Sequence, residues 1–196
     1  SQFSFLNVFS YITFRTGVAI FTSLIIVLIF GKPFIKYLKS SSHFNQPIRD
    51  DGPTSHLIKK AGTPTFGGIL IIVGILCSTI LWSDIQNIFV LICIFSILSF
   101  ALIGFIDDFF KIKFKNSRGI SAFTKIIFQL IFSLMIFYLV SISTPVEKRY
   151  LLNLPYYKDL IFDVGYFYFP FAAIVIIGSS NAVNLTDGLD GLATVP

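Results

Sequence analysis

Two adjacent aspartates, Asp107 and Asp108, stand at the end of a long uncharged block, in the stretch FALIGFIDDFFKIKFK. Neighbouring carboxylates repel each other, and a divalent cation, or a substrate group that shares a proton with them, relieves that repulsion. A carboxylate in such a pair is also a candidate general base. Because acids at the edge of an apolar span are usually functional, we interpret the pair as catalytic. The alternative is a solvated pair that marks the end of a helix.

A second polar set follows the last apolar block at intervals of three residues: Asn181, Asn184, Asp187 and Asp190. On a continuous helix this spacing drifts slowly around the surface, so that all four side chains are able to line one wall of a cavity. Gly188 and Gly191 instead favour a break in the helix and a loop in which the backbone approaches a ligand closely. Amide and carboxylate groups recognise a base or bind Mg²⁺. A polar turn between two helices is the alternative, since Asp-Gly is a common turn signal.

A third polar stretch, RDDGPTSHLIKKAGTPTFGG, precedes the second apolar block. Its Lys60 and Thr65 are able to bind phosphate through charge and hydroxyl contacts, and Lys59 is an equal candidate. The GxxxxGK[ST] spacing of a Walker loop is absent from this stretch. Taken together, hard oxygen ligands, lysines and a hydrophobic body indicate phosphoryl chemistry on a lipid substrate at a membrane surface.

The elements that must position these residues are membrane spans. Of the 196 residues, 55% are hydrophobic and only 13% are charged, which is typical of a membrane protein and not of a soluble domain. A bilayer core requires about 20 apolar residues per helix. We therefore predict an all-α polytopic membrane protein that forms a single domain over residues 1–196. Its five spanning helices are expected at 16–31 (extending to about Ile35), 61–83, 85–106, 126–146 and 164–186. We interpret the first block as a retained helix, because no signal-peptide cleavage site follows it.

The distribution of lysine and arginine predicts the orientation, since positive charge is retained on the cytoplasmic side. Residues 32–60 hold six basic side chains and residues 107–125 hold five, whereas the opposite side holds four. The N-terminus is therefore expected outside, with all three polar stretches in the cytoplasm. The net charge of +5 suits anionic lipid headgroups or phosphorylated substrates. Nucleic acid is not an expected partner, because the basic residues sit in short loops tied to the bilayer.

Three of these stretches, TPTFGG, IDDFFK and NAVNLTDGLDGLA, resemble in order and placement the bacterial phospho-N-acetylmuramoyl-pentapeptide transferases of the glycosyltransferase 4 family. The resemblance extends through NVFSYITFR and IRDDGPTSH, so it covers nearly the whole chain. It implies a Mg²⁺-dependent transfer of phospho-MurNAc-pentapeptide from its UDP carrier to undecaprenyl phosphate in the bacterial inner membrane. The products are lipid I, for peptidoglycan synthesis, and UMP. The bilayer and a second copy of the chain, in a homodimer, are further implied partners.

The resemblance also implies roles for individual residues. Asp107 and Asp108 correspond to the catalytic acids and Asp187 to a metal ligand. The implied substrate-binding positions are Lys60, Thr65, Lys111, Lys125, Asn181, Asn184 and Asp190. Which acid is the base, and whether Lys59 or Lys60 meets the substrate, stays open, because HLIKKAG is one residue longer than the family pattern. Phe66 stands where the family usually has Met.

Members of this family have about ten spans, which is about twice the number expected here. The part beyond the fifth span normally brings another metal-site aspartate and a histidine-rich motif, so we expect residues 1–196 alone to be inactive. Three alternatives stay open: a related polyprenyl-phosphate N-acetylhexosamine-1-phosphate transferase, half of a transporter, and a non-catalytic fragment. A transporter explains the spans but not why the acids and lysines avoid their middles.

Overall fold

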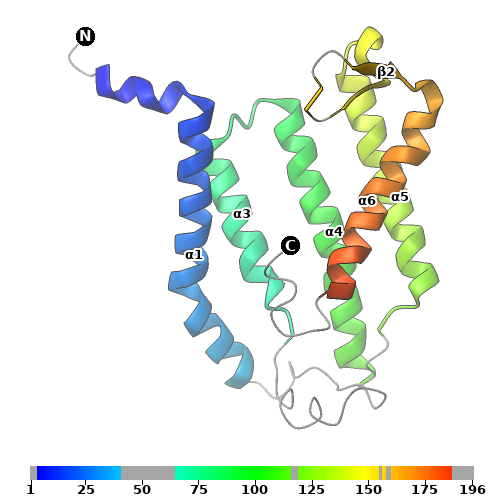
Figure 1. The fold of residues 1–196 in the computed structure, drawn as a ribbon. Coiled ribbons are helices and arrows are strands. Elements are labelled where there is room, and N and C mark those ends of the chain that lie inside the picture. The colour runs from blue at the N-terminus through cyan, green and yellow to red at the C-terminus, as the bar shows by residue number, and fades with distance from the viewer. Residues whose placement is uncertain (1–3, 41–64, 116–118, 155, 158–159, 187–196) are drawn as a thin grey trace. The chain divides into compact units, whose positions relative to one another are not determined.

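A computed structural model describes residues 4–40, 65–115, 119–154, 156–157 and 160–186 of the chain (Figure 1). The described elements are, in order, η1 (Ser4–Ser10), α1 (Ile12–Ser40), α3 (Gly68–Trp82), α4 (Ile88–Lys113), α5 (Ala122–Ser143), η3 (Val146–Lys148), β1 (Leu151–Asn153), β2 (Ile161–Asp163), η4 (Gly165–Phe167) and α6 (Tyr168–Thr186). They belong to two compact units, residues 1–121 and 122–196. That the chain forms a single domain stays a prediction.

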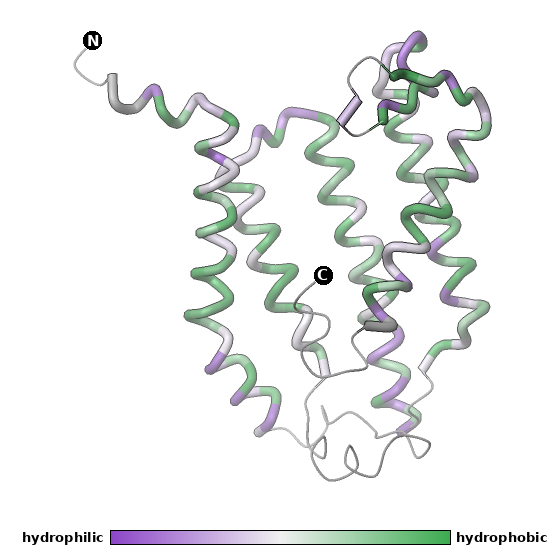
Figure 2. Tube along the Cα trace, viewed as in Figure 1, coloured by the Kyte–Doolittle hydropathy of each residue, from purple (hydrophilic) through white to green (hydrophobic). Residues whose placement is uncertain are grey.

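Long apolar helices dominate both units, as Figure 2 shows by hydropathy. Four stretches are long and apolar enough to cross a membrane: Ile12–Ser40, Ile88–Lys113, Ala122–Ser143 and Gly165–Asn184. Helix α3 is apolar but has 15 described residues, about 22 Å at 1.5 Å per residue against a hydrocarbon core of about 30 Å. The predicted span there began at Ala61. It is wrong for residues 65–67, which form a turn before α3, and residues 61–64 lie outside the described part. The all-α, multi-pass membrane architecture is confirmed.

Two helices extend further than the hydrophobic pattern predicted. Helix α1 runs from Ile12 to Ser40, with Pro33 inside it, where the uncharged block covered residues 16–31. Helix α4 continues to Lys113 and so carries Asp107 and Asp108 within its last two turns. The interpretation of the acids as markers of the helix end is therefore wrong. Lysines are good helix formers and are favourable in a last turn, where they face the negative end of the helix dipole.

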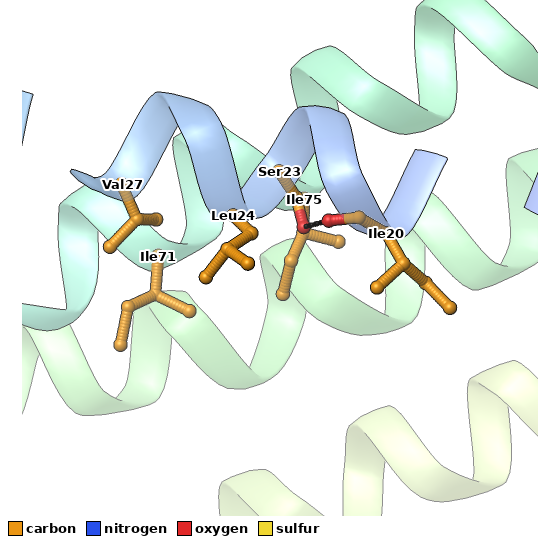
Figure 3. Close-up of a pocket in the computed structure, with 6 residues that line it drawn as sticks. All are labelled: Ile20, Ser23, Leu24, Val27, Ile71 and Ile75. Atoms are coloured by element: carbon orange, nitrogen blue, oxygen red, sulfur yellow. Dashed lines mark hydrogen bonds between the residues drawn. The ribbon is translucent and has the colours of Figure 1, made fainter. Parts of the chain in front are cut away.

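The first unit contains a close packing of α1 on α3. Gly74 of α3 allows it, because a Cβ atom there would stand 3.2 Å from Val27 Cγ2 and 3.3 Å from the Ser23 carbonyl oxygen. Trp82 Nε1 donates a hydrogen bond of 3.0 Å to Thr22 Oγ1 across the same pair of helices. Beside this contact lies the apolar groove of Figure 3, which is lined by Ile20, Ser23, Leu24, Val27, Ile71 and Ile75.

The second unit pairs α5 with α6 in antiparallel directions. Near one end of the pair, the Asn181 side chain donates a hydrogen bond to that of Gln129. Further along α5, the ring centroids of Phe137 and Phe169 lie 3.9 Å apart. A small hairpin is inserted between the two helices, with β1 antiparallel to β2 and Leu152 opposite Phe162. The sequence pattern did not predict it, because three-residue strands are too short to show an alternation.

Replacing Gly74 by Leu should lower the free energy of unfolding by about 1–3 kcal/mol, because the larger side chain forces α1 away from α3. Gly104→Leu is the matched control, since no atom lies within 4 Å of a Cβ built at that glycine. Thermal unfolding in detergent should show a lower midpoint for the first variant only. Equal midpoints would contradict the close helix packing.

Candidate functional site

Lys111 joins the two aspartates of α4 into one ionic cluster. Its Nζ lies 2.7 Å from Asp107 Oδ2 and 3.2 Å from Asp108 Oδ1. These contacts follow from helix geometry, because residues three and four positions apart lie on the same face. Asp107 is 8% exposed as a residue, while the Asp108 side chain keeps 30% of its surface open. The repulsion that the sequence predicted is therefore relieved by a lysine of the same helix.

The TPTFGG stretch supplies the second partner of Asp108. Thr65 Oγ1 donates a hydrogen bond of 2.7 Å to Asp108 Oδ2, across 43 residues of chain, and Thr65 is itself 8% exposed. The next residue, Phe66, has a φ of 69°, a left-handed conformation that is rare for a bulky residue and is stored strain. Its ring packs on Phe105 of α4, with centroids 5.1 Å apart. The hydrogen bond and the ring contact hold this strained turn against α4.

The loop after α4 supplies the second partner of Asp107. The backbone N–H of Ile120 donates to Asp107 Oδ1 at 3.0 Å. Gly119 turns the chain for this contact with a φ of +63°, and a Cβ atom at Gly119 would collide with the Asp107 carboxylate. Glycine is thus required here twice, for its backbone conformation and for the close approach to the acid.

The cluster has the chemistry of a Mg²⁺ site that needs further ligands. Within the described ranges there is no group of three or more His, Cys, Asp or Glu side chains able to hold a metal ion. Mg²⁺ commonly takes one or two protein carboxylates and completes its shell with water and substrate phosphates. The two carboxylates of α4 fit that role, since each oxygen has a second lone pair beyond the hydrogen bond that it already accepts.

In the second unit the structure confirms that Asn181 and Asn184 lie on one helix, α6, with Asn184 exposed. Asn181 Nδ2 donates to Gln129 Oε1 of α5 at 2.8 Å. Lys125 lies one turn before Gln129 on the same face of α5. Because the helices are antiparallel, Lys125 and Asn184 lie toward the same end of this unit.

The remaining predicted site residues, Lys60, Asp187 and Asp190, lie outside the described residues, as does Lys59. Their roles stay predictions.

Sequence reasoning missed Gly119, Ile120 and Gln129. An isolated glycine after a basic helix end is only a weak signal in a sequence. A hydrogen bond from a backbone N–H, such as that of Ile120, leaves no signal in the residue type. Gln129 had a readable signal, because it is a large amide inside the uncharged block IIFQLIFSLMIF. Polar residues within membrane spans are often functional.

Comparisons with known proteins identify the family of the chain. A family model described as glycosyl transferase family 4 matches residues 89–196. Three similar proteins are each named phospho-N-acetylmuramoyl-pentapeptide-transferase. That of Pelagibacter ubique is 52% identical over 100% of this chain and 54% of its own length. That of Rickettsia prowazekii is 50% identical over 97% and 52%, and that of a Ruegeria species 45% identical over 98% and 53%. The chain thus spans about half the length of the curated relatives it matches.

Lys111→Met should destabilise the protein by about 2 kcal/mol, below the ~3–5 kcal/mol of a fully buried pair, because it leaves Asp107 charged and without its ionic partner. Combining it with Asp107→Asn should restore part of the loss, since the only carboxylate then left without the lysine is Asp108, whose side chain is 30% exposed. Thermal unfolding in detergent measures both effects. Lys113→Met is the control on the same helix, an exposed lysine 5.9 Å from two aromatic ring centres. An equal loss in the control would exclude a special role for the ion pair.

Gly119→Ala should lower the free energy of unfolding by more than the left-handed backbone conformation alone explains. Gly165→Ala is the matched control, because Gly165 also has a positive φ of 52° but has no atom within 4 Å of a built Cβ. The control should lose about 1–2 kcal/mol from the left-handed conformation. Gly119→Ala should lose that amount and at least about 1 kcal/mol more, from the displacement of Asp107. Equal unfolding midpoints would show that the loop does not press on the carboxylate.

Proposed function

We propose, from the premise that the chain belongs to glycosyl transferase family 4, that the full-length protein transfers phospho-MurNAc-pentapeptide from its UDP-linked form to undecaprenyl phosphate. The observation that carries the proposal is the lysine-bridged acid pair at the end of a membrane span. The proposal is further supported by the transferase activity for which similar proteins are named, since these proteins are about half identical over nearly the whole chain.

In the proposed reaction an oxygen of the lipid phosphate attacks the phosphorus that carries the sugar. The bond from that phosphorus to the bridging oxygen breaks, and UMP leaves with that oxygen, so that the lipid diphosphate known as lipid I remains. Such phosphoryl transfer needs mostly positioning and charge stabilisation. A membrane protein that holds its charged groups at a span end suits a substrate with one end in lipid.

Asp108 is the better placed of the two acids to meet the lipid phosphate, because 30% of its side chain is exposed against 11% for Asp107. It would accept a proton from that phosphate or orient it. Asp107, the more buried of the two, would hold Lys111 and the loop at Ile120 in place. The Lys111 ammonium has three N–H donors and binds two carboxylates, so one donor is left for a phosphate oxygen.

The proposed cofactor is Mg²⁺, for which Asp187 is the proposed protein ligand and substrate oxygens would supply further ligands. When bound, Mg²⁺ supplies positive charge that stabilises the departing UMP. We assign the remaining polar residues to the substrate: Lys60 and Lys125 to phosphate oxygens, and Asn181, Asn184 and Asp190 to the uridine end. Thr65 would join the phosphate contacts only by releasing its O–H from Asp108. These roles require the three polar stretches to face the cytoplasm of a bacterial inner membrane. A homodimer is part of the same proposal.

The test is UMP release from the UDP-linked precursor by a full-length protein that carries this sequence, in lipid or detergent, with and without Mg²⁺. Asp107→Asn, Asp108→Asn and Asp187→Asn should each lower turnover about a hundredfold or more, with folding retained. Asp107→Asn should fold because Lys111 keeps Asp108 as a partner.

UDP-N-acetylglucosamine is the substrate control, since a related hexosamine-phosphate transferase would use it and the proposed enzyme would not. Near-normal turnover of a variant would remove its residue from the mechanism. The absence of Mg²⁺-dependent UMP release by the unmodified full-length protein would refute the proposed function.

A further inference from the structure

A chain of hydrogen-bonded amides crosses from α5 to α6 in the second unit. Gln129 is 1% exposed, although it lies within a membrane-spanning helix. Its Oε1 accepts from Asn181 Nδ2 at 2.8 Å, and its Nε2 donates to Ser180 Oγ at 3.3 Å. An amide in apolar surroundings is costly unless it is paired. Among the described residues, the hydrogen-bond partners of Gln129 both lie on α6.

The orientation of the Asn181 amide follows from its second bond. Asn181 Nδ2 also donates to the carbonyl oxygen of Ile177, at 2.9 Å. A backbone carbonyl only accepts, so the nitrogen and not the oxygen of the amide must face Ile177. With Nδ2 fixed on that side, Gln129 must in turn present its oxygen to Asn181. The two amides therefore hold each other in one orientation.

This arrangement consumes both N–H donors of Asn181. An asparagine amide has two donors and one acceptor oxygen, and the donors go to Gln129 and Ile177. What the side chain is able to offer a ligand is thus its Oδ1. Asparagine side chains usually both donate and accept hydrogen bonds, whereas Asn181 is left only to accept from a ligand.

We propose that Gln129 is a positioning residue that presents Asn181 to the substrate as a fixed acceptor oxygen. The complementary ligand group is electron-poor: an N–H or O–H of the nucleotide sugar, or Mg²⁺. The inference rests on the proposed function, because it takes Asn181 to be a substrate-binding residue. Two features of the same helices support the placement. Asn184 lies exposed one turn beyond Asn181, and Lys125 lies one turn before Gln129 toward the same end.

The alternative role for Gln129 is to stabilise the packing of the two helices, as polar side chains often do in membranes. That role predicts a change in stability alone. Positioning predicts in addition a selective change in substrate or metal affinity. The α5 helix offers a matched control in Ser133, which is also 1% exposed, lies one turn from Gln129, and has a hydroxyl group without a hydrogen-bond partner in the described part of the chain.

The experiment compares Gln129→Leu, Gln129→Glu and Ser133→Ala in a full-length protein that carries this sequence. Titration calorimetry gives the dissociation constants for Mg²⁺ and for the UDP-linked precursor, and UMP release gives kcat and KM. Gln129→Leu should raise the dissociation constant of one of these two ligands about tenfold, equivalent to about 1.4 kcal/mol. The KM for undecaprenyl phosphate should stay unchanged. A shift for the precursor measured without Mg²⁺ identifies a hydrogen-bond donor as the ligand group, and a shift for Mg²⁺ alone identifies the metal.

Gln129→Glu should recover most of the affinity, because its carboxyl group keeps an oxygen acceptor for Asn181 Nδ2. Ser133→Ala should leave every constant unchanged, since no hydrogen bond is removed. A lower unfolding midpoint for Gln129→Leu with unchanged constants would overturn the positioning role, and so would an equal affinity loss in Ser133→Ala. If the unmodified protein binds the precursor but releases no UMP, the proposed function fails while the positioning role is still decided by the dissociation constants.

Discussion

The ammonium of Lys111, held between two carboxylates, is the interaction on which the first unit depends. Two adjacent acids in the last turns of an apolar helix would repel each other strongly without a nearby cation. Lys111 supplies it from one turn away, at 2.7 Å and 3.2 Å. The outer oxygens are then free to bind Thr65 on one side and the Ile120 N–H on the other. Three segments of the chain are thereby fixed around one charge.

This arrangement explains how a membrane helix tolerates acids before any ligand arrives. With Lys111 in place the cluster carries one net negative charge instead of two. The repulsion between the acids is thereby reduced, and the remaining negative charge is compatible with the Mg²⁺ that the proposed function requires. The strain at Phe66 is consistent with such a purpose, because a left-handed bulky residue persists only where surrounding contacts over-determine it. Those contacts are the Thr65 hydrogen bond and the Phe105 ring.

The spans, the acid pair and the polar character of α6 were predictable from the sequence, because each is a property of residue type along the chain. The partners were not. That Thr65 meets Asp108, or that Gly119 lets the backbone reach Asp107, depends on segments brought together by folding. The helix ends were misjudged for another reason. In α1 the hydrophobic run gives way to Lys32, Lys36 and Lys39, yet the helix continues through them. This is possible because the stem of a lysine packs on apolar surface while its charge reaches water.

The two units satisfy the same constraint in different ways. A charged or amide group within an apolar span is costly unless it finds a partner inside the protein, and the cost of an unpaired charge exceeds that of an unpaired amide. The first unit uses an ion pair, and it does so in the last two turns of α4. The second unit places its amide, Gln129, about two turns inside α5 and pairs it without any charge. Charge near a helix end is suited to meet a charged substrate directly, whereas a neutral amide deeper in the span is suited to orient a neighbour.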